Sequence, residues 1–114
     1  MIAFTELLSM RCRPLDGGAP MSTEEISAQL NVLPGWREHE GSIERRFVFA
    51  DFYQSVAFVN ALAWIAHRED HHPDLAVSYA SVTVRFNTHS VGGISINDFI
   101  CAAQVQALVA PRAA

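Results

Sequence analysis

The stretch 82-VTVRFNTHSVGGISINDFICAAQVQAL-108 carries the clearest fold signal in this chain of 114 residues. Its first part alternates apolar and polar residues, the period-2 pattern of a strand with one buried face. The apolar members are Val82, Val84 and Phe86. Gly92-Gly93 breaks the strand, and Ser95 with Asp98 then forms the pattern of a capping box. Because apolar residues recur at steps of up to four as far as Leu108, we expect a half-buried strand followed by a helix.

Similar start signals mark two helices upstream. Ser22 with Glu25 forms a capping box that opens a helix, and Pro34-Gly35 ends it. Asp51 is the expected N-cap of the longest helical pattern, which ends near Arg68. The sequence therefore predicts three helices, separated by segments that do not follow helical periodicity.

Strand patterns occupy the segments between these helices. Residues 36–40 and 43–50 flank Gly41-Ser42 and are expected to form one hairpin, and residues 75–78 pair with the strand that begins at Val82. The element order is helix, strand, strand, helix, strand, strand, helix. This order predicts an α+β fold with a four-stranded antiparallel sheet and three helices on one face.

The length is that of one domain. Residues 1–20 contain several glycines and prolines that break periodicity, so we expect an irregular N-terminal lead. The folded domain is expected over residues 21–114, without an internal linker or repeat.

The charge pattern argues against several classes of protein. Net charge is −4, the chain contains no lysine, and its 8 arginines are scattered. This is not the basic stripe of a nucleic-acid-binding protein, so no direct nucleic-acid partner is expected. Without lysine, the chain cannot form a Schiff base through a side-chain amine or build a Walker-type phosphate loop.

The two cysteines, Cys12 and Cys101, lie far apart and show no CxxC spacing. A disulfide framework is therefore not expected, and a reducing compartment is favoured. Residues 1–8 lack the basic start of a signal peptide, and no stretch approaches about 18 uninterrupted apolar residues. We expect a soluble, cytoplasmic protein that does not associate with membranes.

Three of the 5 histidines form the main chemical feature, as His71-His72-Pro73 and His89. Histidine exchanges protons near neutral pH and is a common metal ligand. The residue before a proline favours extended backbone, so the helix should end at or before His72. His67 lies one helical turn before His71. The set suggests either proton transfer or metal binding at the junction of helix and strand.

The metal reading is the weaker one. Imidazole is a frequent zinc ligand, and Glu69 or Asp70 could add a carboxylate. However, the chain has neither an HExxH motif nor a Cys/His finger spacing. The side chains of His71 and His72 would also point in different directions from an extended backbone. Asp98 is read most simply as the capping-box partner of its helix.

The fixed spacing of these residues resembles the signature of the pterin-4a-carbinolamine dehydratases, which are 4a-hydroxytetrahydrobiopterin dehydratases. The residues that carry the signature are His67, His71-His72-Pro73, Tyr79, His89 and Asp98. Three further segments are similar to that family: Leu33-Pro34-Gly35-Trp36, residues 47–52 and Thr88-His89 before Gly92-Gly93. The start of the chain from Arg11-Cys12 to Pro20 also looks like the lead of bacterial members.

The resemblance implies a lyase that dehydrates a 4a-hydroxytetrahydropterin to a quinonoid dihydropterin in tetrahydrobiopterin recycling. It implies that three histidines are catalytic: His71, His72 and His89. The implied substrate contacts are His71, His72, Pro73, Thr88, His89, Ser90 and Val91. The implied supporting residues are His67, Asp70, Tyr79 and Asp98. No metal and no redox cofactor are implied.

The family also suggests partners. Its members are dimers or tetramers, and their substrate is released by aromatic amino acid hydroxylases, so a homo-oligomer and a hydroxylase pathway partner are expected. The animal protein also acts as a dimerisation cofactor for a transcription factor. A non-enzymatic, coactivator-like binding module is therefore the alternative to the enzyme.

The residues fit the dehydration on chemical grounds. One acid must protonate the leaving hydroxyl group and one base must accept the proton of the adjacent ring nitrogen, and imidazoles can fill both roles. We expect His71 and His89 to transfer protons and His72 to assist, with acid and base unassigned. His67 stands where the family often has an acidic residue, and Asp70 or Glu69 could supply the missing carboxylate.

Overall fold

The computed structural model describes residues 1–109 of the chain as helices, a single 3₁₀ turn and four strands. In chain order these elements are α1 (Phe4–Ser9), α2 (Thr23–Leu30), β1 (Arg37–His39), β2 (Ser42–Val48), α3 (Phe52–Glu69), β3 (Asp74–Val77), β4 (Ser81–Phe86), η1 (His89–Val91) and α4 (Ile96–Ala107).

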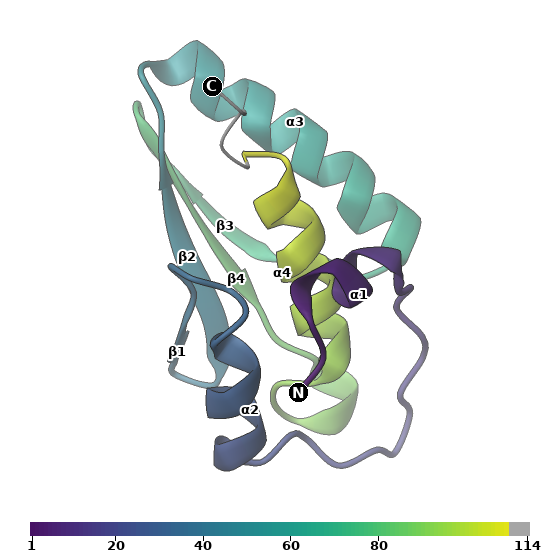
Figure 1. The fold of residues 1–114 in the computed structure, drawn as a ribbon. Coiled ribbons are helices and arrows are strands. Elements are labelled where there is room, and N and C mark those ends of the chain that lie inside the picture. Colours follow the sequence, from purple (N-terminus) through teal and green to yellow (C-terminus); the bar gives the residue numbers. More distant parts are fainter. Residues whose placement is uncertain (110–114) are drawn as a thin grey trace.

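The strands form one antiparallel sheet in the order β1-β2-β4-β3. The two hairpins therefore meet through their second strands, with β2 and β4 at the centre and the short strands at the edges. Helices α3 and α4 lie against one face of this sheet, and α1 packs on α4 (Figure 1). The predicted α+β class and four-stranded antiparallel sheet are confirmed.

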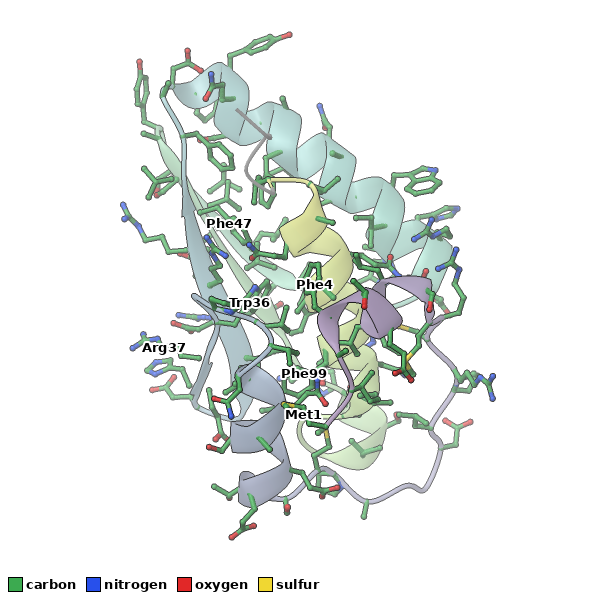
Figure 2. The ribbon with its side chains drawn as sticks, in the orientation of Figure 1. Met1, Phe4, Trp36, Arg37, Phe47 and Phe99 are labelled. Atoms are coloured by element: carbon green, nitrogen blue, oxygen red, sulfur yellow. The ribbon has the colours of Figure 1, made fainter. Side chains whose placement is uncertain are left out.

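The core lies between the sheet and these helices. From the sheet it takes the inward residues of β2 and of β4, and the sequence predicted the alternation of β4. Figure 2 shows Trp36, Phe47 and Phe99 pointing into this layer while Arg37 points outward. The Trp36 ring contacts the ring of Phe47 edge-on and stacks on Phe86, with centroids 5.9 Å and 6.2 Å away. Burial of these large aromatic surfaces stabilises the fold together with the aliphatic residues of the core.

The β1–β2 hairpin turns one residue earlier than expected. Its two turn residues are Glu40 and Gly41, while Ser42 already belongs to β2 and pairs with His39. Both turn residues have positive φ, 50° and 80°, as a type I′ turn requires. The right-handed twist of the strands favours this turn, and the non-glycine Glu40 accepts the left-handed conformation to provide it.

The helix start signals are confirmed. Ser22 and Glu25 form a complete capping box at α2, and Ser95 and Asp98 form another at α4. At α3, the Asp51 carboxylate accepts a hydrogen bond from the Gln54 backbone N–H at 2.9 Å. These local bonds satisfy N–H groups that have no partner within the helix.

The N-terminal lead is more ordered than the sequence suggested. Residues 4–9 form α1, and Leu7 is completely buried against the core. The helix has no side-chain cap and is very short, so local propensity could not have indicated it. It forms because packing on α4 removes Leu7 from water. The domain boundary expected at residue 21 stays a prediction, and residues 110–114 lie outside the described part.

Buried polar side chains hold the segment that follows α1. Glu69 Oε1 accepts a hydrogen bond from the Cys12 backbone N–H at 2.9 Å. The Asn97 side chain accepts from the Arg13 backbone N–H and donates to the Arg13 carbonyl, at 3.2 Å and 2.7 Å. Because Glu69 ends α3 and Asn97 begins α4, the lead is tied to both helices near the histidines.

We call these contacts of Glu69 and Asn97 with the N-terminal lead the clamp. The negative charge of Glu69 is part of it. Burial by itself would raise the pKa of the Glu69 carboxyl. Hydrogen bonds from Cys12, Gln104 and Arg68, with the nearby charge of Arg11, outweigh burial and hold that pKa below its usual value. A carboxyl group whose pKa is lower in the folded state than in the unfolded state stabilises the protein at pH values above its ordinary pKa.

Within residues 1–109, none of the helices combines the length and the apolar character that crossing a membrane would require.

The variant Glu69→Gln tests the clamp. We expect it to lower the free energy of unfolding by about 1–3 kcal/mol at neutral pH. The carboxylate of Glu69 accepts hydrogen bonds with both oxygens, whereas the glutamine places an N–H₂ group, itself a donor, against one set of these donors. The difference from the wild type should shrink in acid as pH falls through the folded pKa of Glu69, where the wild type also loses the charge. Urea unfolding at several pH values measures this. The control is Glu24→Gln at an exposed position of α2, and equal unfolding curves for the two variants would contradict the role of Glu69.

Candidate active site

The end of α3 aims His71 toward the core. Asp70 caps the helix in the left-handed conformation, with φ of 50°, which turns the chain sharply. The His71 backbone N–H then donates to the Ala66 carbonyl at 3.2 Å, a bond typical of a helix that ends in this way. The helix thus stops before His72, as Pro73 predicted.

The His71 side chain is fixed by two contacts. Its Nε2 lies 2.6 Å from Asp98 Oδ1, and its ring lies parallel to that of Phe86, with 9° between the planes and 5.9 Å between the centroids. The side chain of Asp98 is fully buried and that of His71 is 12% exposed. One bond and one stacking contact therefore set both the position and the plane of the imidazole.

The sequence predicted that Asp98 caps its helix, α4. In the structure this side chain also binds residues of the cavity. Its Oδ2 accepts hydrogen bonds from the Ser95 backbone N–H at 2.9 Å and from Thr88 Oγ1 at 2.8 Å. The hydroxyls of Thr88 and Ser95 lie 2.7 Å apart. Since the Thr88 proton is used on Asp98, the Ser95 hydroxyl donates to Thr88 Oγ1. This network leaves Oδ1 for His71 and ties the imidazole to the start of α4.

The three histidines of the sequence prediction border one cavity of about 300 Å³. It lies where α3 ends, β3 begins and β4 leads into η1. Its lining residues are Asp70, His71, His72, Asp74, Arg85, Asn87, Thr88, His89 and Ser90. The structure thus brings together His71, His72 and His89 with Asp70, Thr88 and Ser90 from the predicted set. Two predicted substrate contacts, Pro73 and Val91, do not line this cavity.

Two predicted supporting residues lie elsewhere. His67 is exposed on α3 and lines neither this cavity nor a second cavity beside it, which is described below. Tyr79 is 68% exposed in the β3–β4 turn, at the end of β3 away from Asp74, and its carbonyl accepts a hydrogen bond from Ser55. The carboxylate beside His71 belongs to Asp98, whereas Glu69 is engaged in holding the lead.

Three polar residues of the cavity were absent from the sequence prediction: Asp74, Arg85 and Asn87. Arg85 occupies a polar position of the β4 alternation and Asn87 follows the strand two residues later, so the sequence pattern placed both on the outer sheet face. What it did not show is that this face continues into the histidine cavity. The register that sets Asp74 opposite Arg85 is a tertiary feature.

A second cavity of about 430 Å³ adjoins the first. The two share Asp70, His71, Thr88 and Ser90, and the far wall of the second is formed by the lead at residues 12–16. The clamp of Glu69 and Asn97 therefore positions part of the surroundings of His71.

Cys12 of this wall contacts Cys101 of α4. Cys12 Sγ lies 3.5 Å from Cys101 Sγ, and both are free thiols. The hydrogen bond between them, together with burial, raises the pKa of the Cys101 thiol. The fold thus brings the two cysteines close together although they lie far apart in the sequence.

Across residues 1–109, no three His, Cys, Asp or Glu side chains gather in a geometry that could hold a metal ion.

These features define a class of protein: a small α+β domain that holds several imidazoles around a polar cavity, suited to acid–base chemistry on a small molecule. A family model described as pterin 4 alpha carbinolamine dehydratase matches residues 19–108. The chain belongs to this family, and the resemblance seen in the sequence is confirmed.

Relatives provisionally named pterin-4-alpha-carbinolamine dehydratase cover most of the chain. The protein from Stenotrophomonas maltophilia is 52% identical, over 90% of this chain and 90% of its own length. The protein from Nitrosospira multiformis is 47% identical, over 90% and 92%.

Solved structures share the fold. A transcriptional coactivator/pterin dehydratase from Brucella melitensis has a TM-score of 0.75 at 31% identity, covering 78% of this chain and 97% of its own. A pterin dehydratase-like protein, identified as a RuBisCO assembly factor in the alpha-carboxysome, has a TM-score of 0.58 at 25% identity, covering 68% and 93%.

The variant Asp98→Asn tests the network around His71. An asparagine offers one acceptor oxygen where Asp98 offers two, so one donor among Ser95, Thr88 and His71 faces an N–H₂ group. We expect a loss of about 1–3 kcal/mol in the free energy of unfolding and a change in the His71 ring tautomer. Chemical denaturation and ¹⁵N NMR of the imidazoles measure the two effects. The exposed Glu38→Gln on β1 is the control, and unchanged His71 ring shifts in Asp98→Asn would contradict the network.

Proposed function

We propose that this protein is a hydro-lyase that converts a 4a-hydroxytetrahydropterin to a quinonoid dihydropterin and water. The observation that carries the proposal is the His71–Asp98 pair at a cavity that His72 and His89 also line. Membership of the pterin carbinolamine dehydratase family supplies the substrate class. The two together favour acid–base catalysis by imidazoles.

The proposed reaction balances with two proton transfers. One group donates a proton to the 4a hydroxyl, and the C4a–O bond breaks as water leaves. The electron pair of the adjacent ring nitrogen N5 forms the new double bond to C4a. A base then takes the N5 proton, so the protein ends with the number of protons it began with. Each positioned transfer typically contributes about 10²- to 10⁴-fold to the rate.

The proposed role of His71 follows from its bond to Asp98. Because the carboxylate can only accept, Nε2 of a neutral His71 carries the hydrogen, and Nδ1 keeps the lone pair. Nδ1 is then the nitrogen that exchanges a proton with substrate. His89 is exposed on η1 and can exchange its proton with water between turnovers, and the exposed His72 assists at the rim.

A second function is favoured by what the solved relatives are called. One is a transcriptional coactivator as well as a pterin dehydratase, and the other is an assembly factor. A binding module could retain the fold without using the cavity for chemistry. Such a protein would not depend on the imidazoles, so the histidine variants separate the two functions.

We further propose a homo-oligomer that acts in the cytoplasm, recycling the pterin released by an aromatic amino acid hydroxylase. The sheet edge supports self-association, since Leu75 and Val77 of the edge strand β3 are 37% and 44% exposed. Apolar side chains on an edge strand favour pairing with another chain.

The dehydration assay with freshly generated 4a-hydroxytetrahydropterin tests the enzyme. We expect the wild type to exceed the spontaneous rate, and His71→Ala and His89→Ala each to lower kcat/KM by about 10²- to 10⁴-fold, because each removes a proton-transfer group. His39→Ala on β1 is the matched control and should keep wild-type activity. A wild type no faster than the spontaneous reaction would exclude the enzyme, and active histidine variants would exclude the proposed roles.

Light scattering tests the oligomer. We expect a mass in solution of at least twice the chain mass of 12.6 kDa, because a domain of this size buries a modest share of its surface alone. A mass that stays at one chain across concentrations would contradict self-association.

A further inference from the structure

The carboxylate of Asp74 and the guanidinium of Arg85 lie side by side in the cavity of about 300 Å³ that the three histidines line, here called the histidine cavity. Asp74 begins β3 and lies directly opposite Arg85 of β4 in the sheet register, and both line the cavity with His71 and His89. Directly opposite residues on neighbouring strands have side chains on the same face, with Cβ atoms about 4.5–5.5 Å apart. A planar ligand could therefore contact both groups along one edge.

Arg85 is held from its other side. Its Nε donates to Glu44 Oε1 at 2.8 Å, while the guanidinium of Arg37 donates to Glu44 Oε2 through Nε and Nη2, at 3.1 Å and 2.8 Å. Burial would raise the pKa of Glu44, but its bonds to Arg37 and Arg85 hold that pKa below the usual value. Glu44 thus stays charged and anchors Arg85 through Nε, leaving the two terminal nitrogens for a ligand.

Asp74 is not used by this anchor. Among the ion pairs of the described residues, Arg85 pairs with Glu44 and none joins Arg85 to Asp74. Asp74 is exposed where it lines the cavity. The cavity therefore presents a carboxylate that can accept hydrogen bonds next to guanidinium N–H groups that can donate them.

The edge of a pterin has the complementary order of groups. Its 2-amino group and N3–H are neighbouring donors, and O4 beside them is an acceptor. A carboxylate can accept from both donors at once, and a guanidinium can donate to the oxygen. In the same ring C2 lies across from C4a, so anchoring the C2 edge leaves C4a and N5 free to face the imidazoles.

We propose that Asp74 and Arg85 form the recognition pair for the 2-amino-4-oxo edge of the pterin, with Asp74 reading the 2-amino and N3–H groups and Arg85 binding O4. The proposal deepens the proposed function and rests on it for the pterin ring. Asp74 and Arg85 are specificity residues, while the imidazoles carry the chemistry. Glu44 is a positioning residue that acts through Arg85.

The test compares two probes that differ at position 2 of the ring. Pterin carries an amino group there and lumazine carries an oxygen. We expect wild-type protein to bind pterin about tenfold more tightly by calorimetry, because the lumazine oxygen would face the Asp74 carboxylate. Asp74→Asn should lose about tenfold in affinity for pterin and lose the preference over lumazine, since an amide can donate to that oxygen.

The arginine is tested separately. Arg85→Gln should weaken both probes by about tenfold, because both carry O4, and Arg85→Lys should recover part of the loss as a single donor. Matched controls are Arg46→Gln on β2 of the same sheet face and Glu38→Gln on β1, which should bind both probes as the wild type does. In the dehydration assay, Asp74→Asn and Arg85→Gln should raise KM with a much smaller change in kcat.

The outcomes separate this pair from the proposed function. Binding that prefers pterin and depends on Asp74, in a protein without dehydratase activity, would support the pair and overturn the function. A wild type that turns over substrate while Asp74→Asn keeps the full preference for pterin would overturn the pair alone. Circular dichroism of each variant confirms that it is folded, and a folded Arg85→Gln that binds both probes normally also overturns the assignment.

Discussion

The buried carboxylate of Asp98 connects the fold to the cavity. One oxygen helps to cap α4 and accepts from Thr88, and the other holds the His71 ring. Burying a carboxylate costs free energy unless hydrogen-bond donors occupy its acceptor sites. The donors to the fully buried Asp98 are His71 and Thr88, which line the cavity, and the Ser95 backbone N–H at the start of α4. The capping box that begins α4 and the imidazole that lines the cavity are therefore parts of one hydrogen-bond network.

The antiparallel sheet supplies the other half of the cavity. Because β4 lies between β2 and β3, Arg85 on its polar face binds Glu44 of β2 and lies opposite Asp74 of β3. The inward face of the same strand packs Phe86 beneath His71. One strand thus serves the core through alternate residues and the cavity through the others, as the period of two requires.

The N-terminal lead shows how packing extends the site beyond the part that matches the family model. The match begins at residue 19, yet residues 12–16 form a wall of the cavity that adjoins His71. Glu69 and Asn97 hold this wall from the ends of the helices that also carry His71 and Asp98. A buried polar side chain that accepts from a distant backbone leaves little pattern in sequence, because its role depends on where the partner lies.

The sequence alone determined the elements that depend on neighbours along the chain. Capping boxes at Ser22 and Ser95, the N-cap Asp51 and the alternation of β4 act over a few residues, so their patterns are legible. Fixed spacing also pointed to His71, His72 and His89 as one group. Tertiary structure decided the rest. It decided that α1 forms and that the carboxylate bound to His71 is that of Asp98, not Glu69. It also placed His67 and Tyr79 away from the cavity and set Asp74 opposite Arg85. Those facts depend on contacts between residues far apart in the chain, which strand register and helix packing set and which local patterns do not record.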